Sequence, residues 1–184
     1  MSKNIPEQFE TLFASKWVEV RKVGYYSYSH APWSNGVGVA VLPFRINEGG
    51  FYSFLGRFEI TPSHGPDTKL VSITGGYDNA DEYTIEECML NELREEGGYD
   101  APSDAVISLG YLRPSKGSDT LQYIFAVNLD HPDAKTCEAI TDGTEGEQGS
   151  YCEWVSLNDL LESSDPLLHS MYLRMVLGNS NARD

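Results

Sequence analysis

Residues 75–99 read GGYDNADEYTIEECMLNELREEGGY, and this stretch decides how the chain is expected to fold. Thr84 is followed three residues later by Glu87, the signature of a capping box at the start of a helix. The pair Gly97–Gly98 is typical of a helix end, because glycine readily adopts the left-handed conformation found there. The stretch therefore predicts a helix that begins after Thr84, runs to about Glu96 and follows a strand that ends in a glycine pair.

One face of this helix is apolar and another is acidic. The apolar residues recur every three or four positions, which predicts a stripe packed on the core: Ile85, Met89, Leu90 and Leu93. Glu92, Glu95 and Glu96 lie together at the helix end, where like charges repel each other and meet the negative end of the helix dipole. A hard cation such as Mg²⁺ removes both penalties, because it takes oxygen ligands and bridges carboxylates to phosphates. We therefore expect a divalent-metal site, with a solvated acidic helix end as the alternative.

The same residues resemble the Nudix box, G-x5-E-x7-R-E-U-x-E-E-x-G-U, in which U is a bulky aliphatic residue. The matching positions are Gly76, Glu82, Glu92, Leu93, Glu95, Glu96, Gly98 and, less well, Tyr99. Eight residues rather than seven separate Glu82 from the arginine position, and that position is Asn91. In the family this arginine pairs with the first glutamate and orients the metal-binding glutamates. The resemblance therefore gives Glu82 no certain role here.

The resemblance implies an α/β fold, the Nudix-type α/β/α sandwich with a mixed sheet. It also implies that Glu92 and Glu96 are the main ligands of Mg²⁺, for which Mn²⁺ is an alternative ion. By the same analogy, Glu95 binds a second ion or positions a catalytic water, and the Gly75 carbonyl adds an oxygen.

Two further segments resemble the ADP-ribose pyrophosphatase branch of this family. Residues 113–119, RPSKGSD, are similar to its proline-serine-x-glycine segment, which makes Pro114 and Ser115 candidates for substrate binding. The alternative is an ordinary β-turn, which the same residues favour. Residues 54–58, FLGRF, resemble the strand whose arginine contacts the substrate's phosphates, so Arg57 is a third candidate; an edge-strand cation is the alternative.

A third segment, TEGEQG at residues 144–149, lies where related enzymes carry a glutamate that activates the attacking water. Glu147 is the first candidate for this catalytic base and Glu145 the second. A solvated glycine-rich acidic loop is the alternative, and a general base also needs hydrogen-bond reach to its water.

The order of predicted elements suits a single Nudix-like domain over residues 1–184. Residues 1–35 are expected to hold a helix at 6–14 and a strand at 17–23, with apolar and aromatic residues available for a dimer contact. Residues 36–162 form the expected catalytic core, and residues 163–184 form a C-terminal helix. The core strands are expected at 37–44, 51–60, 70–74, 106–112, 121–129 and 151–155, followed by a short helix from Ser156.

The composition of the chain argues against two classes of binding partner, duplex nucleic acid and membrane. The formal net charge of −15 disfavours duplex nucleic acid, whose binding depends on Lys and Arg. No apolar segment approaches the ~18 residues of a membrane helix, so no membrane partner is expected. Three widely spaced cysteines and an N-terminus without a secretory pattern favour a cytoplasmic protein.

The function implied by the resemblance is Mg²⁺-dependent hydrolysis of the pyrophosphate bond in a nucleoside diphosphate linked to another moiety. The best single substrate is ADP-ribose, cleaved to AMP and ribose 5-phosphate by a homodimer. Alternatives within the class are a nucleotide-sugar, a dinucleoside polyphosphate, NADH or a capped RNA end. The alternative outside it is a Nudix-like module that senses a nucleotide without cleaving it.

Overall fold

The computed structural model describes residues 8–78, 82–139 and 149–178. Within these residues a seven-stranded mixed sheet has the order β12-β5-β4-β10-β9, with β6 paired to β5 and β7 paired to β4. The strands are β4 (Val37–Ile46), β5 (Tyr52–Glu59), β6 (Lys69–Val71), β7 (Ile73–Gly76), β9 (Val106–Leu112), β10 (Leu121–Asn128) and β12 (Tyr151–Ser156). The β10–β4 pair is parallel and the others in this sheet are antiparallel.

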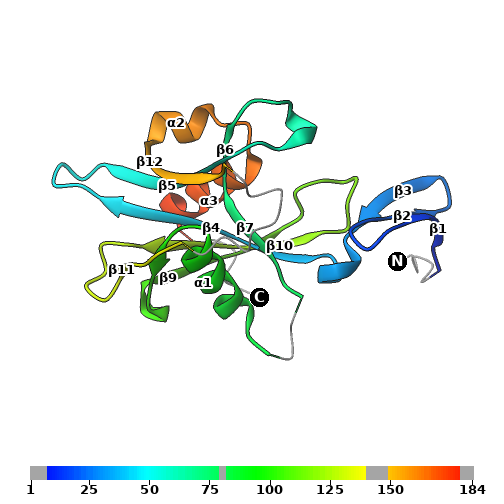
Figure 1. The fold of residues 1–184 in the computed structure, drawn as a ribbon, viewed down its shortest axis with the longest axis horizontal. Coiled ribbons are helices and arrows are strands. Elements are labelled where there is room, and N and C mark those ends of the chain that lie inside the picture. The colour runs from blue at the N-terminus through cyan, green and yellow to red at the C-terminus, as the bar shows by residue number, and fades with distance from the viewer. Residues whose placement is uncertain (1–7, 79–81, 140–148, 179–184) are drawn as a thin grey trace.

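Helices cover both faces of this sheet (Figure 1). Helix α1 (Ile85–Glu95) packs on one face, while α2 (Leu157–Glu162) and α3 (Pro166–Leu177) pack on the other. The predicted α/β/α sandwich is therefore confirmed. Smaller elements are β8 (Tyr99–Asp100) paired with β11 (Lys135–Thr136), and the short 3-10 helices η1 (Pro32–Ser34), η2 (Pro62–His64) and η3 (Ser103–Ala105).

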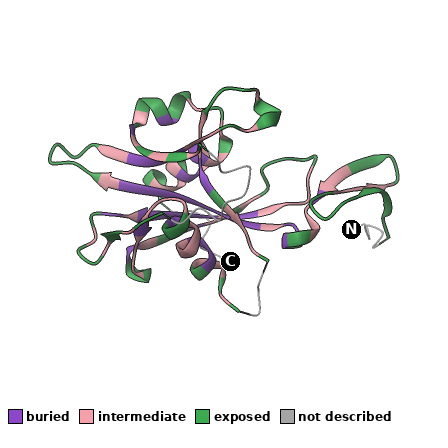
Figure 2. Cartoon of the chain, viewed as in Figure 1, coloured by how far each residue is buried: buried purple, intermediate pink, exposed green. Residues whose placement is uncertain are grey.

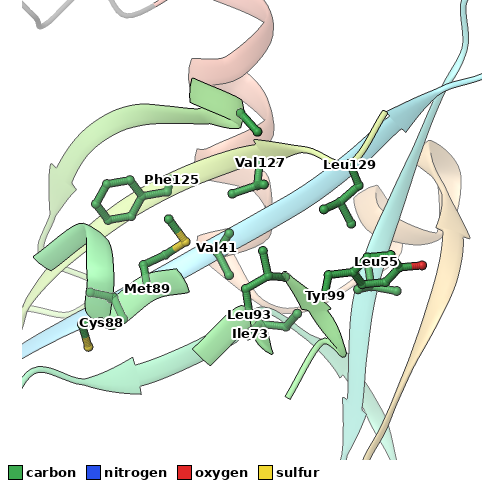
Figure 3. Close-up of a cluster of buried hydrophobic side chains, with 12 residues drawn as sticks. Val41, Leu55, Ile73, Cys88, Met89, Leu93, Tyr99, Phe125, Val127 and Leu129 are labelled. Atoms are coloured by element: carbon green, nitrogen blue, oxygen red, sulfur yellow. The ribbon is translucent and has the colours of Figure 1, made fainter. Parts of the chain in front are cut away.

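Two apolar clusters fill the layers between helices and sheet, and Figure 2 shows buried residues running through the middle of the sheet. The cluster under α1 includes Met89 and Leu93, both fully buried, packed with Val41, Ile73 and Val127 (Figure 3). The second cluster lies between the sheet and helices α2 and α3. Because α1 is anchored by the first cluster, its C-terminal glutamates are held at a fixed place beside the sheet.

The start of α1 is as predicted. Thr84 Oγ1 accepts a hydrogen bond from the Glu87 backbone N at 3.2 Å, and the Glu87 carboxylate accepts one from the Thr84 backbone N at 2.8 Å. This reciprocal capping box satisfies two backbone donors that the helix itself leaves unpaired. The predicted apolar stripe is also confirmed, with Ile85 and Leu90 packed at its edge.

The helix predicted at residues 6–14 is wrong over Glu10–Ala14, which form strand β1. With β2 (Glu19–Val23) and β3 (Tyr26–His30) it makes an antiparallel three-stranded sheet that projects from the main body (Figure 1). Ser15 Oγ accepts hydrogen bonds from the backbone N atoms of Trp17 and Val18, and this turn brings β1 back along β2. A helix this short is marginal alone, so pairing with β2 overrides the local pattern.

The strand expected at residues 70–74 is divided into β6 and β7 at Ser72. The backbone N and the hydroxyl of Ser72 both donate to Asp165 Oδ2 at 2.7 Å. Asp165 also caps the start of α3, because its Oδ1 accepts from the Leu167 backbone N at 2.8 Å. The interruption therefore ties this part of the sheet to α3.

None of the helices in the described parts of the chain is long and apolar enough to cross a membrane.

Candidate active site

Glu92 lies directly against the end of β7. A Cβ atom built on Gly75 would be 1.9 Å from Glu92 Oε1, far inside contact distance, so the carboxylate occupies the space that a side chain would need. Two of the predicted metal ligands, one from α1 and one from the glycine pair, are thus brought together. Position 75 therefore has to be glycine as long as the Glu92 carboxylate lies beside it.

Glu96 meets Arg57 from β5. The distance from Arg57 Nη1 to Glu96 Oε1 is 2.5 Å, and the side chains are only 7% and 14% exposed. The sequence assigned these two residues to different tasks, metal binding and phosphate binding. The structure pairs them, although they lie on different elements.

Arg57 has further contacts that hold it in place. Its Nε donates to Glu59 Oε2 at 3.0 Å and its Nη2 donates to Ser150 Oγ at 3.3 Å. Burial by itself lowers the pKa of Arg57, but Glu96 and Glu59 raise it, and the net shift is upward. The guanidinium is therefore a permanent positive charge in an acidic protein.

A cavity of about 300 Å³ opens beside this ion pair. Its lining residues are Arg57, Glu96, Gly97, Ala139, Ser150, Tyr151 and Cys152. Cys152 lies opposite Arg57 in the β12–β5 pair, and its thiol donates to the Glu96 carbonyl oxygen at 3.3 Å. Burial raises the pKa of Cys152 to about 11, Arg57 lowers it and Glu96 raises it again, so the group is a neutral thiol near pH 7.

The donors at this end of α1 suit a hard divalent cation. Glu92 and Glu96 are one helical turn apart, so their carboxylates are neighbours on the helix surface, and oxygen is the donor that Mg²⁺ takes. Within the described residues, however, no three His, Cys, Asp or Glu side chains form a group that could hold a metal ion. Glu95 is exposed, and Glu96 is drawn to Arg57. The oxygen donors therefore suit Mg²⁺, but in this structure the described carboxylates do not surround a single point.

Pro114 and Ser115 lie on an exposed loop on the side of the N-terminal sheet. Ser115 Oγ accepts a hydrogen bond from the Gly117 backbone N at 2.9 Å, which is a local turn contact. The loop is docked on β3, where Ser29 N donates to the Gly117 carbonyl at 2.8 Å and the His30 ring nitrogen Nδ1 lies 2.9 Å from Asp119 Oδ2. No contact given for the described residues joins Pro114 or Ser115 to the glutamates of α1.

Glu145 and Glu147, the candidates for the catalytic base, lie outside the described residues. Their assignment stays a prediction from the sequence.

Asn91, at the position of the family's arginine, makes a contact within its own helix. Its Oδ1 accepts a hydrogen bond from Arg94 Nη1 at 3.4 Å, and Arg94 in turn pairs with Asp100 at 2.5 Å on the surface. Glu82 is exposed in the turn before α1.

Sequence reasoning missed Glu59, Ser150 and Cys152, which all surround Arg57. Glu59 had a local signal, because residues two apart on a strand point to the same face. Ser150 and Cys152 had none, because only the pairing of β12 with β5 brings them near Arg57.

A second cavity, of about 390 Å³, is lined by both glycines of the pair and by Trp33. The ring of Trp33 covers Gly76, where an added Cβ would be 1.9 Å from Trp33 Cζ3. Trp33 is 44% exposed and makes an edge contact with Trp17, with ring centroids 6.3 Å apart. An aromatic surface is therefore present at the glycine pair, on the opposite strand face from Glu92.

Comparison with known proteins gives the family of this chain. The family model of the NUDIX domain matches residues 35–174, most of the sequence, and reaches from the start of β4 into α3. The chain therefore belongs to the Nudix family. Among curated proteins, none matches the chain.

Solved structures show the same fold. An ADP compounds hydrolase superposes with a TM-score of 0.62 at 18% sequence identity, covering 94% of this chain and 95% of that one. The NUDIX domain of Shewanella oneidensis NrtR, in complex with ADP-ribose, gives a TM-score of 0.54 at 13% identity, with coverages of 77% and 88%. At such identities the likeness concerns the fold.

Proposed function

We propose that this Nudix protein is a Mg²⁺-dependent pyrophosphohydrolase that cleaves the diphosphate of a nucleoside diphosphate linked to another moiety. The observation that carries the proposal is a pair of contacts at the end of α1, where Glu92 lies against Gly75 and Glu96, one helical turn further on, pairs with Arg57. Oxygen donors for a cation and a fixed guanidinium for an anion are the two recognition elements that a diphosphate needs. ADP-ribose is the preferred substrate, because segments 54–58 and 113–119 resemble the ADP-ribose pyrophosphatase branch.

In this proposal each residue has a defined task. Glu92 and Glu96, with the Gly75 carbonyl, would hold the metal, which would supply charge neutralisation at the diphosphate and lower the pKa of a bound water. Glu95, at the exposed end of the helix, would bind a second ion or position the attacking water. Arg57 binds a phosphate oxygen, and Pro114 and Ser115 border the substrate.

The bond changes follow from attack by water on phosphorus. Glu147, or Glu145 in its place, accepts the proton of the attacking water as the new phosphorus–oxygen bond forms. The bond between phosphorus and the bridging oxygen breaks, and ADP-ribose yields AMP and ribose 5-phosphate. No covalent enzyme intermediate is needed, because the water is the nucleophile.

The test is AMP release from ADP-ribose, nucleotide-sugars, dinucleoside polyphosphates and NADH, each with Mg²⁺, Mn²⁺ or EDTA. We expect metal-dependent cleavage, fastest with ADP-ribose, and its loss in Glu96→Gln. Glu86→Gln is the matched control, because it removes the same charge from the first turn of the same helix. Tight nucleotide binding without any cleavage would instead support the sensing module.

A homodimer is part of the proposal. The N-terminal sheet and the turns that flank its strands expose large apolar side chains, and contiguous exposed apolar surface marks contact sites: Phe9, Leu12, Phe13, Trp17, Val18, Tyr25 and Tyr26. Sedimentation at micromolar concentration should give twice the chain mass. A monomer at all concentrations would exclude the dimer without affecting the hydrolysis proposal.

A further inference from the structure

Arg57 is a buried cation placed on a carboxylate that the proposed function assigns to a metal. Its side chain is 7% exposed, and its Nη1 is 2.5 Å from Glu96 Oε1. Glu59 holds the Nε atom of the same guanidinium, and Ser150 accepts from Nη2. The guanidinium therefore has three contacts: Glu59 on its own strand, Ser150 just before β12, and Glu96 at the end of α1.

A guanidinium and a divalent cation at one carboxylate work against each other. Two like charges a few ångströms apart repel, and the repulsion is weakly screened where water is largely excluded. Mg²⁺ also requires nearly ideal octahedral geometry around itself, so the Glu96 oxygen that Arg57 holds is less able to turn toward a metal.

We propose that Arg57 and the divalent metal compete for Glu96, so that metal binding releases the guanidinium from α1. This inference rests on the proposed function, since it assumes that Glu96 is a metal ligand. On release, Glu59 keeps hold of Nε and Ser150 keeps hold of Nη2, while Nη1 becomes available to the adjoining cavity of about 300 Å³ that Arg57 and Glu96 both line. A buried cation that loses one anion needs another, which a substrate phosphate provides.

The competition couples the binding of metal to the binding of phosphate. Without metal, Arg57 neutralises Glu96 and the cavity offers a weaker attraction to anions. With metal bound, the freed guanidinium strengthens phosphate binding, and by linkage a bound phosphate strengthens metal binding. If Arg57 instead only supports Glu96, removing Arg57 should weaken metal binding, because the metal ligand would lose its support.

The decisive measurement is the affinity for Mn²⁺ alone, without nucleotide, by electron paramagnetic resonance of free Mn²⁺ with the full chain. We expect Arg57→Gln to bind Mn²⁺ roughly tenfold more tightly than the wild type, within the usual range of coupling between sites. Arg94→Gln is the matched control, because it removes the same charge from the end of α1 but pairs with Asp100 rather than Glu96. Its affinity should equal that of the wild type.

Unchanged or weaker Mn²⁺ binding in Arg57→Gln would overturn the inference and leave the hydrolysis proposal standing if Glu96→Gln still abolishes cleavage. A wild type that binds no Mn²⁺ would overturn the metal-dependent function itself. If thermal melts show that Arg57→Gln is unfolded, Arg57→Met takes its place, because an unbranched apolar side chain suits the same buried position. Tighter Mn²⁺ binding in either folded variant supports the competition.

Discussion

The Glu92 carboxylate of α1 occupies the position of the missing side chain of Gly75 in β7, with Oε1 only 1.9 Å from where a Cβ would stand. This contact joins the last turn of the helix to the strand beside it. If Glu92 is a metal ligand, even a methyl group added at Gly75 should disturb metal binding.

Gly75→Ala should weaken Mn²⁺ binding by about tenfold or more, a typical effect of disturbing the support of a ligand. The added methyl group cannot coexist with Glu92 in its present place, so the carboxylate must move. Gly117→Ala is the control, because the nearest atom to its new Cβ is Ser115 Oγ at 3.4 Å, an ordinary contact. Calorimetric titration with Mn²⁺ measures both affinities. Equal Mn²⁺ affinities in Gly75→Ala and Gly117→Ala would contradict the prediction.

Leu93→Ala should destabilise the fold by about 3 kcal/mol, within the usual range for truncating a buried leucine. Leu93 is fully buried in the cluster between α1 and the sheet, so the change leaves a cavity. Urea unfolding measures the loss. A loss well under 1 kcal/mol would mean that α1 is not anchored as described.

The capping box should make stability depend on pH through Glu87. Hydrogen bonds from the Thr84 backbone N and then from its hydroxyl lower the pKa of Glu87 in the folded state. The stabilisation is therefore complete above the unfolded pKa of about 4.3 and is lost as the pH falls through the lower folded value. Glu87→Gln should be less stable than the wild type at pH 7, and the difference should shrink in acid. A difference that stays constant from pH 7 to pH 2 would contradict the shifted pKa.

Cys152 should react slowly with iodoacetamide near neutral pH. With a pKa of about 11, roughly a thousandth of this thiol is ionised at pH 8, and only the thiolate is the nucleophile. Alkylation should accelerate steadily as the pH rises toward 11, whereas in denaturant Cys152 should react at an ordinary rate. Peptide mapping identifies the modified residue, and fast labelling of folded Cys152 at pH 7 would contradict its burial.

The parts of the fold that local signals define could be predicted from sequence. The start of α1 depends on Thr84 and Glu87, three residues apart, and its orientation depends on a stripe within eleven residues. The resemblance to the Nudix box likewise assigned Gly75 and Glu92 to one site. The capping box and the stripe are each encoded within a single helix, and the glycine pair belongs to the same short motif.

The remaining features depend on partners far away in the sequence. Strand β1 exists because it pairs with β2, which a local apolar pattern does not reveal. The meeting of Arg57 with Glu96 requires the correct placement of β5 beside the end of α1, and neither residue carries a signal for the other.

Gly75 and Gly76 are each required by a different side chain, Glu92 on one face of β7 and Trp33 on the other. Adjacent strand residues face opposite ways, so a single dipeptide is fixed from both sides at once. In a library randomised at these two codons, selection for folded, metal-binding protein should return glycine at both positions. Selection for folding alone should relax the first codon before the second, because the carboxylate end of Glu92 is flexible, whereas the Trp33 ring is also in edge contact with Trp17.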